Sequence, residues 1–161
     1  MIILKIFVVS DTHGRINLFV NYAKTLEKPA LIIHLGDNVE DANEIGKVMG
    51  VEVIVVKGNC DFVSNSIDSE KLLIIKGKRI FITHGHRYSV KYGVSEIYNK
   101  GKEVNADLVL FGHTHSPFII NEKCGIIIMN PGSPTLPRGN SSYSFGVVEI
   151  NEKLTTKIIE F

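Results

Sequence analysis

The six histidines of this sequence lie in short polar clusters whose residue types suit metal binding. Each histidine is within three residues of a glycine, an aspartate or another histidine. The clusters are Asp11-Thr-His13, His34-Leu-Gly-Asp37, Gly58-Asn-Cys-Asp61, Thr83-His-Gly-His86 and Gly112-His-Thr-His115. Imidazole nitrogens, together with carboxylate and amide oxygens, suit Mn²⁺, Fe, Co²⁺, Ni²⁺ or Zn²⁺. The pattern therefore predicts an enzyme that uses two metal ions.

Two aspartates are the predicted carboxylate ligands. Asp11 and His13 directly follow an apolar run, and alternation along an extended segment points both side chains toward one cation. Asp37, after Gly36, is expected to lie between two cations roughly 3.5–4 Å apart, with one oxygen on each. The alternatives are structural, with Asp11 as a helix N-cap and Asp37 as a turn residue.

The other predicted ligands are three imidazoles and an amide. His113 and His115 lie on one side of a Gly-His-x-His segment, and His84 ends an apolar run, so all three are expected to bind metal. Asn59 is a credible ligand in their company, although Gly58-Asn59 alone would indicate only a turn.

Apolar runs must position these clusters, and in the first hundred residues their periodicity predicts alternating strands and helices. The expected strands are Ile2–Val9, Leu31–Leu35 and Glu52–Val56, and the expected helices are Asn17–Leu26 and Asp41–Met49. Such alternation implies βαβ units in a mostly parallel sheet.

The second half of the sequence is richer in strands. Lys76-Gly-Lys78 is a hairpin signal between the runs Leu72–Ile75 and Arg79–Thr83, and Val90–Gly101 is an expected helix. The further expected strands are Leu108–Phe111, Phe118–Asn121, Ile126–Asn130, Ser144–Ile150 and Leu154–Glu160. The predicted fold class is α/β, with two sheets packed face to face in a single domain over residues 1–161.

The predicted ligands share one position relative to these elements. His13, Asp37, Asn59, His84 and His113 all fall at or just past the carboxyl end of a predicted strand. In open α/β sheets, ligands bind in the crevice outside those ends. Loops from distant parts of the sequence are therefore expected to converge on one pocket.

Composition limits the classes of function. A chain of 161 residues with 44% hydrophobic and 22% charged residues is typical of a soluble globular protein. Its net charge of +1 gives no electrostatic reason to expect a nucleic-acid or membrane partner, whereas a homo-oligomer stays open. No apolar stretch approaches the roughly 20 residues that span a bilayer. Cys60 and Cys124 form no CxxC pattern, so free thiols and a cytoplasmic location are expected.

Taken together, the clusters resemble those of the calcineurin-like metallophosphoesterases in order and approximate spacing. The resemblance rests on Asp11-x-His13, Gly36-Asp37, Gly58-Asn59, His84 and Gly112-His113-x-His115. Three further segments are similar to the phosphodiesterase branch typified by YfcE, namely Gly58-Asn-Cys-Asp61, Asn130-Pro-Gly-Ser133 and Leu136-Pro-Arg-Gly139. The resemblance implies the metallophosphoesterase fold, a two-sheet β-sandwich flanked by helices, with a dinuclear centre at the strand ends.

The resemblance also implies a ligand set and a reaction. Asp11, His13 and His115 would hold one metal, Asn59, His84 and His113 the other, and Asp37 would bridge them. Mn²⁺ is the favoured ion, with Ni²⁺, Co²⁺, Fe and Zn²⁺ as alternatives. The implied reaction is hydrolysis of a small phosphoester by a metal-bound water, with Asp37, Asn59 and His84 as catalytic residues. The two cations would lower the pKa of the water and clamp the phosphate oxygens.

Cys60 departs from the wider superfamily, in which many members carry histidine after the Gly-Asn pair. A thiol, with a reference pKa near 8.5, protonates an alkoxide leaving group poorly. The sequence therefore predicts a preference for phosphodiesters, or for esters with good leaving groups. The alternative is that Cys60 is only a packed thiol.

Other polar residues near the clusters have weaker assignments. His34 is expected to be a supporting or packed residue, and His86 a supporting or substrate-facing one. Arg15 and Arg138 are candidate phosphate contacts, with surface solvation as the alternative. Asn38 is expected either to orient Asp37 or to form a turn.

Two other functions fit the same resemblance. One is a non-catalytic scaffold like Vps29, which binds partners through its surfaces. The other is a phosphomonoesterase, although a histidine at position 60 would suit that activity better.

Overall fold

The computed structural model describes residues 2–62, 64–121 and 125–161, and its strands form two five-stranded sheets. The first sheet, called sheet A, has the order β10-β9-β1-β2-β3. Its strands are β1 (Leu4–Val9), β2 (Leu31–His34), β3 (Val53–Val55), β9 (Ser144–Ile150) and β10 (Leu154–Glu160). Strands β1, β2 and β3 are parallel, as the sequence predicts, and the antiparallel β9 and β10 complete the sheet.

The second sheet, called sheet B, has the order β4-β5-β6-β8-β7. Its strands are β4 (Glu70–Ile75), β5 (Lys78–Thr83), β6 (Leu108–Leu110), β7 (Pro117–Asn121) and β8 (Ile127–Pro131). The predicted hairpin is the antiparallel pair β4–β5, and its turn places Lys76 and Gly77 at φ values of 47° and 75°. Positive φ at both central residues matches the right-handed twist of paired strands.

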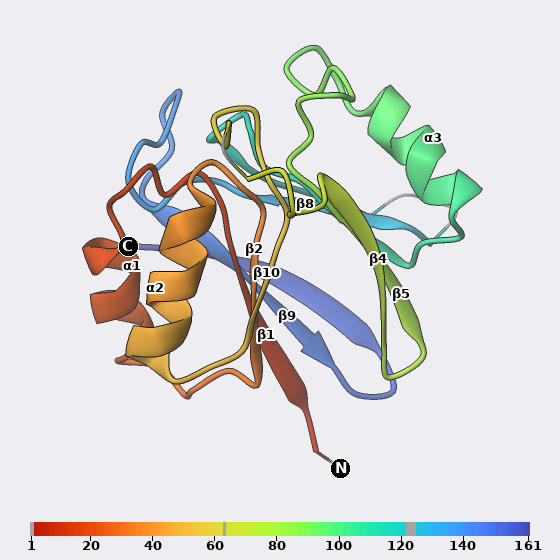
Figure 1. Ribbon diagram of the computed structural model, residues 1–161. Helices are drawn as coiled ribbons and strands as arrows, with labels where there is room; N and C mark the ends of the chain where they lie inside the picture. Colours follow the sequence, from red (N-terminus) through yellow and green to blue (C-terminus); the bar gives the residue numbers. More distant parts are fainter. Residues whose placement is uncertain (1, 63, 122–124) are drawn as a thin grey trace.

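Three hydrophobic layers hold the sheets and helices together. Aliphatic side chains such as Ile33 and Leu108 fill the space between the sheets, which confirms the face-to-face packing predicted from the sequence. The outer face of sheet A is covered by α1 (Asn17–Ala23) and α2 (Val39–Met49), and that of sheet B by α3 (Ser95–Glu103). Figure 1 shows this sandwich, with α1 and α2 on one side and α3 on the other.

Helix α2 lies directly after one of the predicted ligands, and its sequence explains its bounds. Ala42, Ile45 and Met49 are buried at helical spacing. Gly50 ends the helix in the left-handed conformation, with φ of 60°, which glycine adopts without a steric penalty. The helix begins at Val39, two residues before the expected Asp41.

Two other helices differ from the expected bounds. Helix α1 ends at Ala23, before the expected Leu26, and the Thr25 hydroxyl donates a hydrogen bond to the Tyr22 carbonyl just beyond it. Helix α3 begins only at Ser95, although the sequence predicts a helix from Val90. Ser89 and Gly93 have φ values of 50° and 153°, so turns occupy the segment before the helix.

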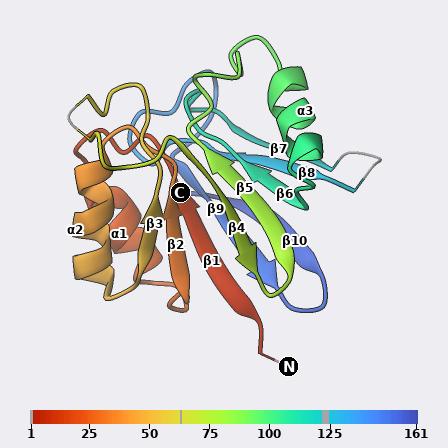
Figure 2. The ribbon, with the colours of Figure 1, turned by 45° about the vertical axis from the view of Figure 1, so that its right-hand side comes forward.

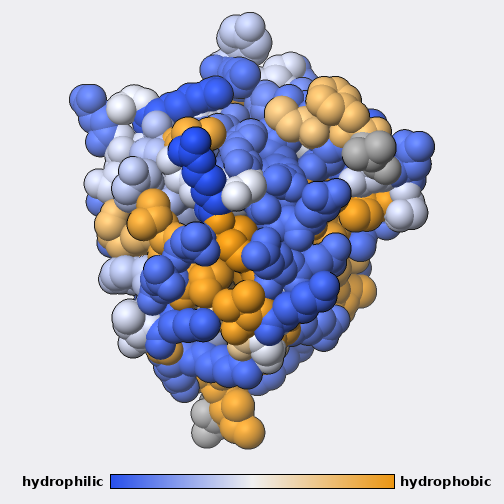
Figure 3. Space-filling model, turned by 60° about the vertical axis from the view of Figure 1, so that its left-hand side comes forward, coloured by the Kyte–Doolittle hydropathy of each residue, from blue (hydrophilic) through white to orange (hydrophobic). Residues whose placement is uncertain are grey.

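The carboxyl ends of β1, β2, β5 and β6 lie at one end of the sandwich. In Figures 1 and 2 the loops that follow these strands gather opposite the N-terminus. The face on the α1 and α2 side is mostly hydrophilic, with hydrophobic side chains gathered near its centre (Figure 3). In the described part of the chain, no helix has the length and apolar character that a bilayer crossing requires.

Candidate metal centre

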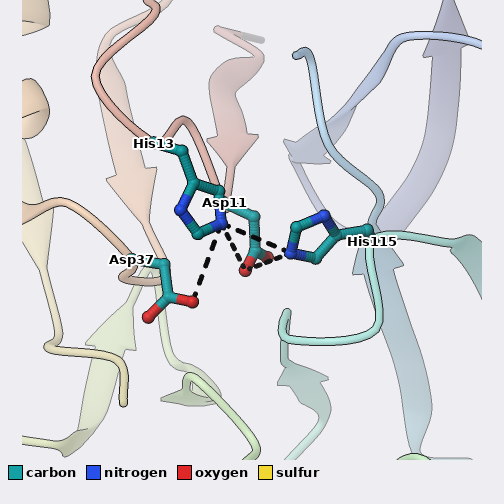
Figure 4. A group of neighbouring side chains, drawn as sticks. All are labelled: Asp11, His13, Asp37 and His115. Carbon is teal, nitrogen blue, oxygen red and sulfur yellow. Dashed lines mark hydrogen bonds and ion pairs between the residues drawn. The ribbon is translucent and has the colours of Figure 1, made fainter. Parts of the chain in front are cut away.

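Two groups of side chains meet at the loop end of the sandwich, and they share Asp37. In each group, one potential ligand atom per residue lies within 4.8 Å of the others. The first group, drawn in Figure 4, consists of Asp11, His13, Asp37 and His115. The second group consists of Asp37, His84 and His113. The loops after β1 and β2 of sheet A and after β5 and β6 of sheet B supply these residues.

Backbone carbonyls orient two of the imidazole rings. Nδ1 of His84 lies 2.8 Å from the Leu35 carbonyl oxygen, and Nδ1 of His115 lies 2.7 Å from that of Leu136. A carbonyl oxygen can only accept, so each Nδ1 carries the donated proton. In the neutral ring Nε2 then keeps its lone pair, which is the form that binds a metal ion.

The lone pairs of these rings face carboxylate oxygens. His84 Nε2 lies 3.4 Å from Asp37 Oδ2, and His115 Nε2 lies 3.2 Å from Asp11 Oδ1. Asp11 Oδ1 and His84 Nε2 are buried, and neither has a well-formed hydrogen bond to any residue that the structure describes. Two facing acceptors repel unless a positive charge lies between them. Burial lowers the pKa of His84, but Asp37 and Asp11 outweigh burial and raise it, so without metal a proton on Nε2 supplies this charge, and a cation can take the place of that proton. The residues present therefore fit bound cations.

Asp37 faces both groups through a single oxygen. Its Oδ2 lies 3.8 Å from His13 Nε2 and 3.4 Å from His84 Nε2, whereas its Oδ1 accepts a 3.0 Å hydrogen bond from the Cys60 backbone N–H. The sequence-based expectation assigns one oxygen to each ion. In the structure, Oδ2 is the oxygen that points toward both positions.

The electrostatics of the site keep both carboxylates ionised. Burial raises the pKa of Asp11 and of Asp37, but the adjacent His115 and His84 rings outweigh burial and hold both pKa values below the usual range. Burial lowers the pKa of His113 to about 4, and the positive charges of His84 and Lys91 add to the effect. Ionised carboxylates beside a neutral imidazole are the protonation states that metal binding needs.

The loops that present these ligands have strained backbones. Nine non-glycine residues of the described chain have positive φ, and six of them belong to the site or adjoin it. These six are Asp11, His13, Asp37, Asn38, His113 and His115. Each such conformation costs about 1 kcal/mol or more and persists only where surrounding contacts impose it.

Close approach of the loops requires glycine at several positions, among them Gly58 and Gly112. A Cβ atom on Gly58 would lie 2.1 Å from Asp37 Oδ1, and one on Gly112 would lie 2.0 Å from the Ser10 hydroxyl. Any side chain at either position would displace the aspartate loops.

Asp61, which the sequence interpretation places in a cluster but gives no role, joins two loops of the site. Its carboxylate accepts hydrogen bonds of 2.7–2.9 Å from four backbone N–H groups, those of Asp37, Asn38, Val39 and Gly58. It therefore caps the start of α2 and fixes the Asp37 loop against the Gly58 loop. Its place in the Gly-Asn-Cys-Asp motif is the signal that could have identified it.

The end of β8 and the loop that follows it support the loops that carry Asp11 and His113. The hydroxyls of Ser133 and Thr135 donate hydrogen bonds of 2.9 and 3.2 Å to the Asp11 carbonyl oxygen. The side-chain amide of Asn130 donates to the Gly112 carbonyl and to Thr114, 2.9 Å in each case. Sequence pattern cannot reveal these contacts, because serine, threonine and asparagine are equally common in solvated loops.

His34 lies beneath both aspartate loops and uses both ring nitrogens. Nδ1 accepts a 3.1 Å hydrogen bond from the Gly36 N–H, so Nε2 donates to the Thr12 hydroxyl at 2.9 Å. Burial lowers the pKa of His34 to about 4, which keeps the ring neutral. These contacts fit the expected supporting role. His86 lies beside the second group, its ring centroid 5.5 Å from that of His84.

Cys60 and Asn59 lie at the exposed side of the site. The Asn59 side-chain amide is 3.6 Å from the Cys60 thiol, and the role of Asn59 as a ligand stays a prediction. Burial and the negative charge of Asp37 raise the pKa of Cys60 to about 11. The thiol therefore stays protonated at neutral pH. The other cysteine, Cys124, lies outside the described residues.

The remaining predicted residues are dispersed around the cluster. Asn38 precedes α2 with φ of 92°, and its backbone N–H binds Asp61. Arg15 and Arg138 are exposed, and their predicted contacts with phosphate stay predictions. Lys91, which the sequence interpretation missed, lies near enough to His113 to lower its pKa.

Comparison with known proteins agrees with this geometry. Residues 4–153 match the calcineurin-like phosphoesterase superfamily domain, and the chain belongs to that superfamily. It is 31% identical to "Probable metallophosphoesterase YsnB" of Bacillus subtilis over 156 residues, which cover 95% of this chain and 88% of YsnB. It is 29% identical to the phosphodiesterase YfcE of Escherichia coli over 108 residues, which cover 61% of this chain and 53% of YfcE.

Two solved structures share the fold. A conserved protein of Streptococcus pneumoniae TIGR4, described as a predicted phosphoesterase, superposes with a TM-score of 0.83 and 26% identity, covering 99% of this chain and 91% of that one. Vps29 of Entamoeba histolytica, solved with Zn²⁺, superposes with a TM-score of 0.77 and 19% identity, covering 97% and 98% of the two chains. The second likeness shows the fold alone.

Proposed function

We propose that this protein is a metal-dependent phosphodiesterase that hydrolyses small phosphate diesters at a centre of two divalent cations. One observation carries the proposal: Asp37 Oδ2 faces two separate groups of imidazoles, beside a buried Asp11 Oδ1 to which no described residue donates a well-formed hydrogen bond. A carboxylate that faces two ligand groups is placed to bridge a pair of cations.

The proposed ligands keep the assignment that the resemblance implies. Asp11, His13 and His115 would hold one ion, His84, His113 and Asn59 the other, and Asp37 both. Mn²⁺ is the proposed ion, because imidazole, carboxylate and amide form a mixed nitrogen and oxygen ligand set. Bound cations would supply Lewis-acid activation of the phosphoryl group and of a nucleophilic water.

The chain itself supplies orientation and charge. The Leu35 and Leu136 carbonyls fix the rings of His84 and His115 with Nε2 toward the centre. The Cys60 N–H holds Oδ1 of Asp37, which leaves Oδ2 directed at both groups. Preorganised ligands of this kind need no rearrangement when substrate arrives.

Cys60 supports the preference for diesters. A group with a pKa of about 11 is a weak acid for protonating a departing alkoxide at neutral pH. Substrates whose leaving groups need little protonation are therefore favoured.

The test compares hydrolysis of bis-p-nitrophenyl phosphate with that of p-nitrophenyl phosphate by metal-stripped and Mn²⁺-replenished protein. The proposal expects activity only after replenishment and a higher kcat/KM for the diester. Faster hydrolysis of the monoester would contradict the diester preference. Inactivity with every divalent cation tried would favour the alternative of a non-catalytic scaffold.

A further inference from the structure

A groove opens directly beside the first ligand group. Its volume is about 350 Å³, and its walls include His13, Asn38, Cys60 and Phe62. His13 belongs both to the groove and to the ligand group, so the two are continuous. A phosphorus atom held at the ligand groups would therefore direct one of its ester substituents into the groove.

Phe62 is the large aromatic side chain of this groove, and it is 85% exposed. It follows Cys60 by two residues, on the loop that Asp61 anchors to the start of α2. A phenyl ring that packs against little of the protein keeps its face available. Such rings bind planar groups, nucleic-acid bases among them, by stacking.

The charges around the groove indicate what kind of group it accepts. No lysine or arginine is among the described residues that line the groove. Two acidic residues, Glu40 and Asp61, do line it. The Asn38 and Val39 N–H groups at the start of α2 already donate to Asp61, so they are not free to bind an anion. The groove therefore suits an uncharged substituent, and Glu40 can accept hydrogen bonds from one that carries hydroxyl or amino groups.

We propose that Phe62 determines specificity by stacking on a planar, uncharged ester substituent of the diester, such as a nucleoside, while Glu40 disfavours additional phosphate groups. This inference rests on the proposed function and names the substrate class of the same site.

Direct binding tests the inference without any need for turnover. The probes are adenosine 5′-monophosphate and methyl phosphate, which share a phosphate and differ in the substituent. Calorimetry on Zn²⁺-loaded protein should show that Phe62→Ala raises the Kd of adenosine 5′-monophosphate about tenfold and leaves that of methyl phosphate unchanged. Phe62→Tyr should restore tight binding of the nucleotide. Equal effects of Phe62→Ala on both probes, or no effect on either, would overturn the inference.

A fluorescence experiment reports the contact itself. The sequence contains no tryptophan, so Phe62→Trp introduces a single tryptophan into the groove, and its emission can be excited apart from that of the five tyrosines. Its emission should be quenched by adenosine 5′-monophosphate and not by methyl phosphate. Tyr92→Trp is the matched control, because Tyr92 is 93% exposed on a different loop and should respond to neither probe. Equal responses at positions 62 and 92 would contradict stacking.

The two proposals fail in different ways. Quenching of the Phe62→Trp fluorescence by the nucleotide, without hydrolysis of any diester, would contradict the proposed function but support stacking at position 62. Hydrolysis of bis-p-nitrophenyl phosphate together with binding that ignores Phe62 would contradict this inference alone.

Discussion

Sheet A and sheet B contribute different chemistry to one site. The loops of sheet A supply both carboxylates, Asp11 and Asp37, together with the imidazole of His13 and the wall of the groove. The loops of sheet B supply imidazoles, His84, His113 and His115. Neither sheet alone presents a complete ligand group, because each group combines an oxygen from sheet A with nitrogen from sheet B.

Contacts between the sheets align the two contributions. The His84 ring donates to the Leu35 carbonyl after β2, and the His113 N–H donates a 3.0 Å hydrogen bond to Asp11 Oδ2. The ligand groups therefore form only when the aliphatic layer between the sheets is packed. The geometry of the ligand groups and the packing of this layer therefore depend on one another.

The largest expected effect comes from the oxygen that serves both groups. Asp37→Asn should lower kcat/KM for bis-p-nitrophenyl phosphate by at least about 1000-fold, because it weakens both cation sites at once. By comparison, removal of a residue that only hydrogen-bonds to a metal ligand typically lowers metal affinity or activity by about 10–100-fold. Steady-state kinetics with saturating Mn²⁺ measures the loss. Activity within tenfold of wild type would contradict a shared carboxylate.

The next prediction concerns His34, which supports the loops of sheet A. Its folded pKa is about 4 against an ordinary value of 6.5, so between these values the unfolded state binds the extra proton. Stability should therefore fall as pH falls, by about 3 kcal/mol between pH 7 and pH 4. Urea unfolding of metal-free protein should show a loss about 3 kcal/mol smaller in His34→Gln than in wild type, because His113, whose pKa is also about 4, titrates in both proteins. Parallel pH profiles for the two proteins would contradict a buried neutral His34.

The imidazoles of sheet B should separate the two cation sites. His115→Ala should lower the affinity for one ion by about 100-fold. His113→Ala should lower the affinity for the other ion by a similar factor, since each ring belongs to a different group. Calorimetric titration with Zn²⁺ should then resolve one tight and one weak site in each variant. Loss of both sites in either variant would indicate that the groups are not independent.

The smallest effect is expected at Cys60, beside the carboxylate of sheet A. Cys60→His introduces a group whose ordinary pKa of about 6.5 suits proton donation near neutral pH. The ratio of p-nitrophenyl phosphate to bis-p-nitrophenyl phosphate hydrolysis should rise about tenfold. Cys60→Ser is the matched control, and an equal rise in that variant would assign the effect to loss of the thiol.

Much of the fold could be predicted because strand periodicity in this sequence is strong. The bounds Ser144–Ile150 and Leu154–Glu160 are those of β9 and β10. Local turn geometry could not be predicted as well. Ser89 has a positive φ in the turns that precede α3, and no hydrophobic pattern in the sequence indicates such a conformation. The superfamily could be recognised because its ligand residues form compact motifs next to strands.

The supporting contacts of the site could not be predicted in the same way. Asp61 and Ser133 act through hydrogen bonds to backbone groups that are distant in sequence, and such contacts depend on how the loops meet. The groove beside Phe62 likewise arises from three separate segments of the chain.

The central claim, a dinuclear centre that hydrolyses diesters, is tested most directly by titrating metal-free protein with Mn²⁺ while bis-p-nitrophenyl phosphate hydrolysis is followed. With protein well above the dissociation constants, the rate should rise until two equivalents per chain are bound and then remain constant. A plateau at one equivalent, or no hydrolysis at any ratio, would contradict the two-cation account.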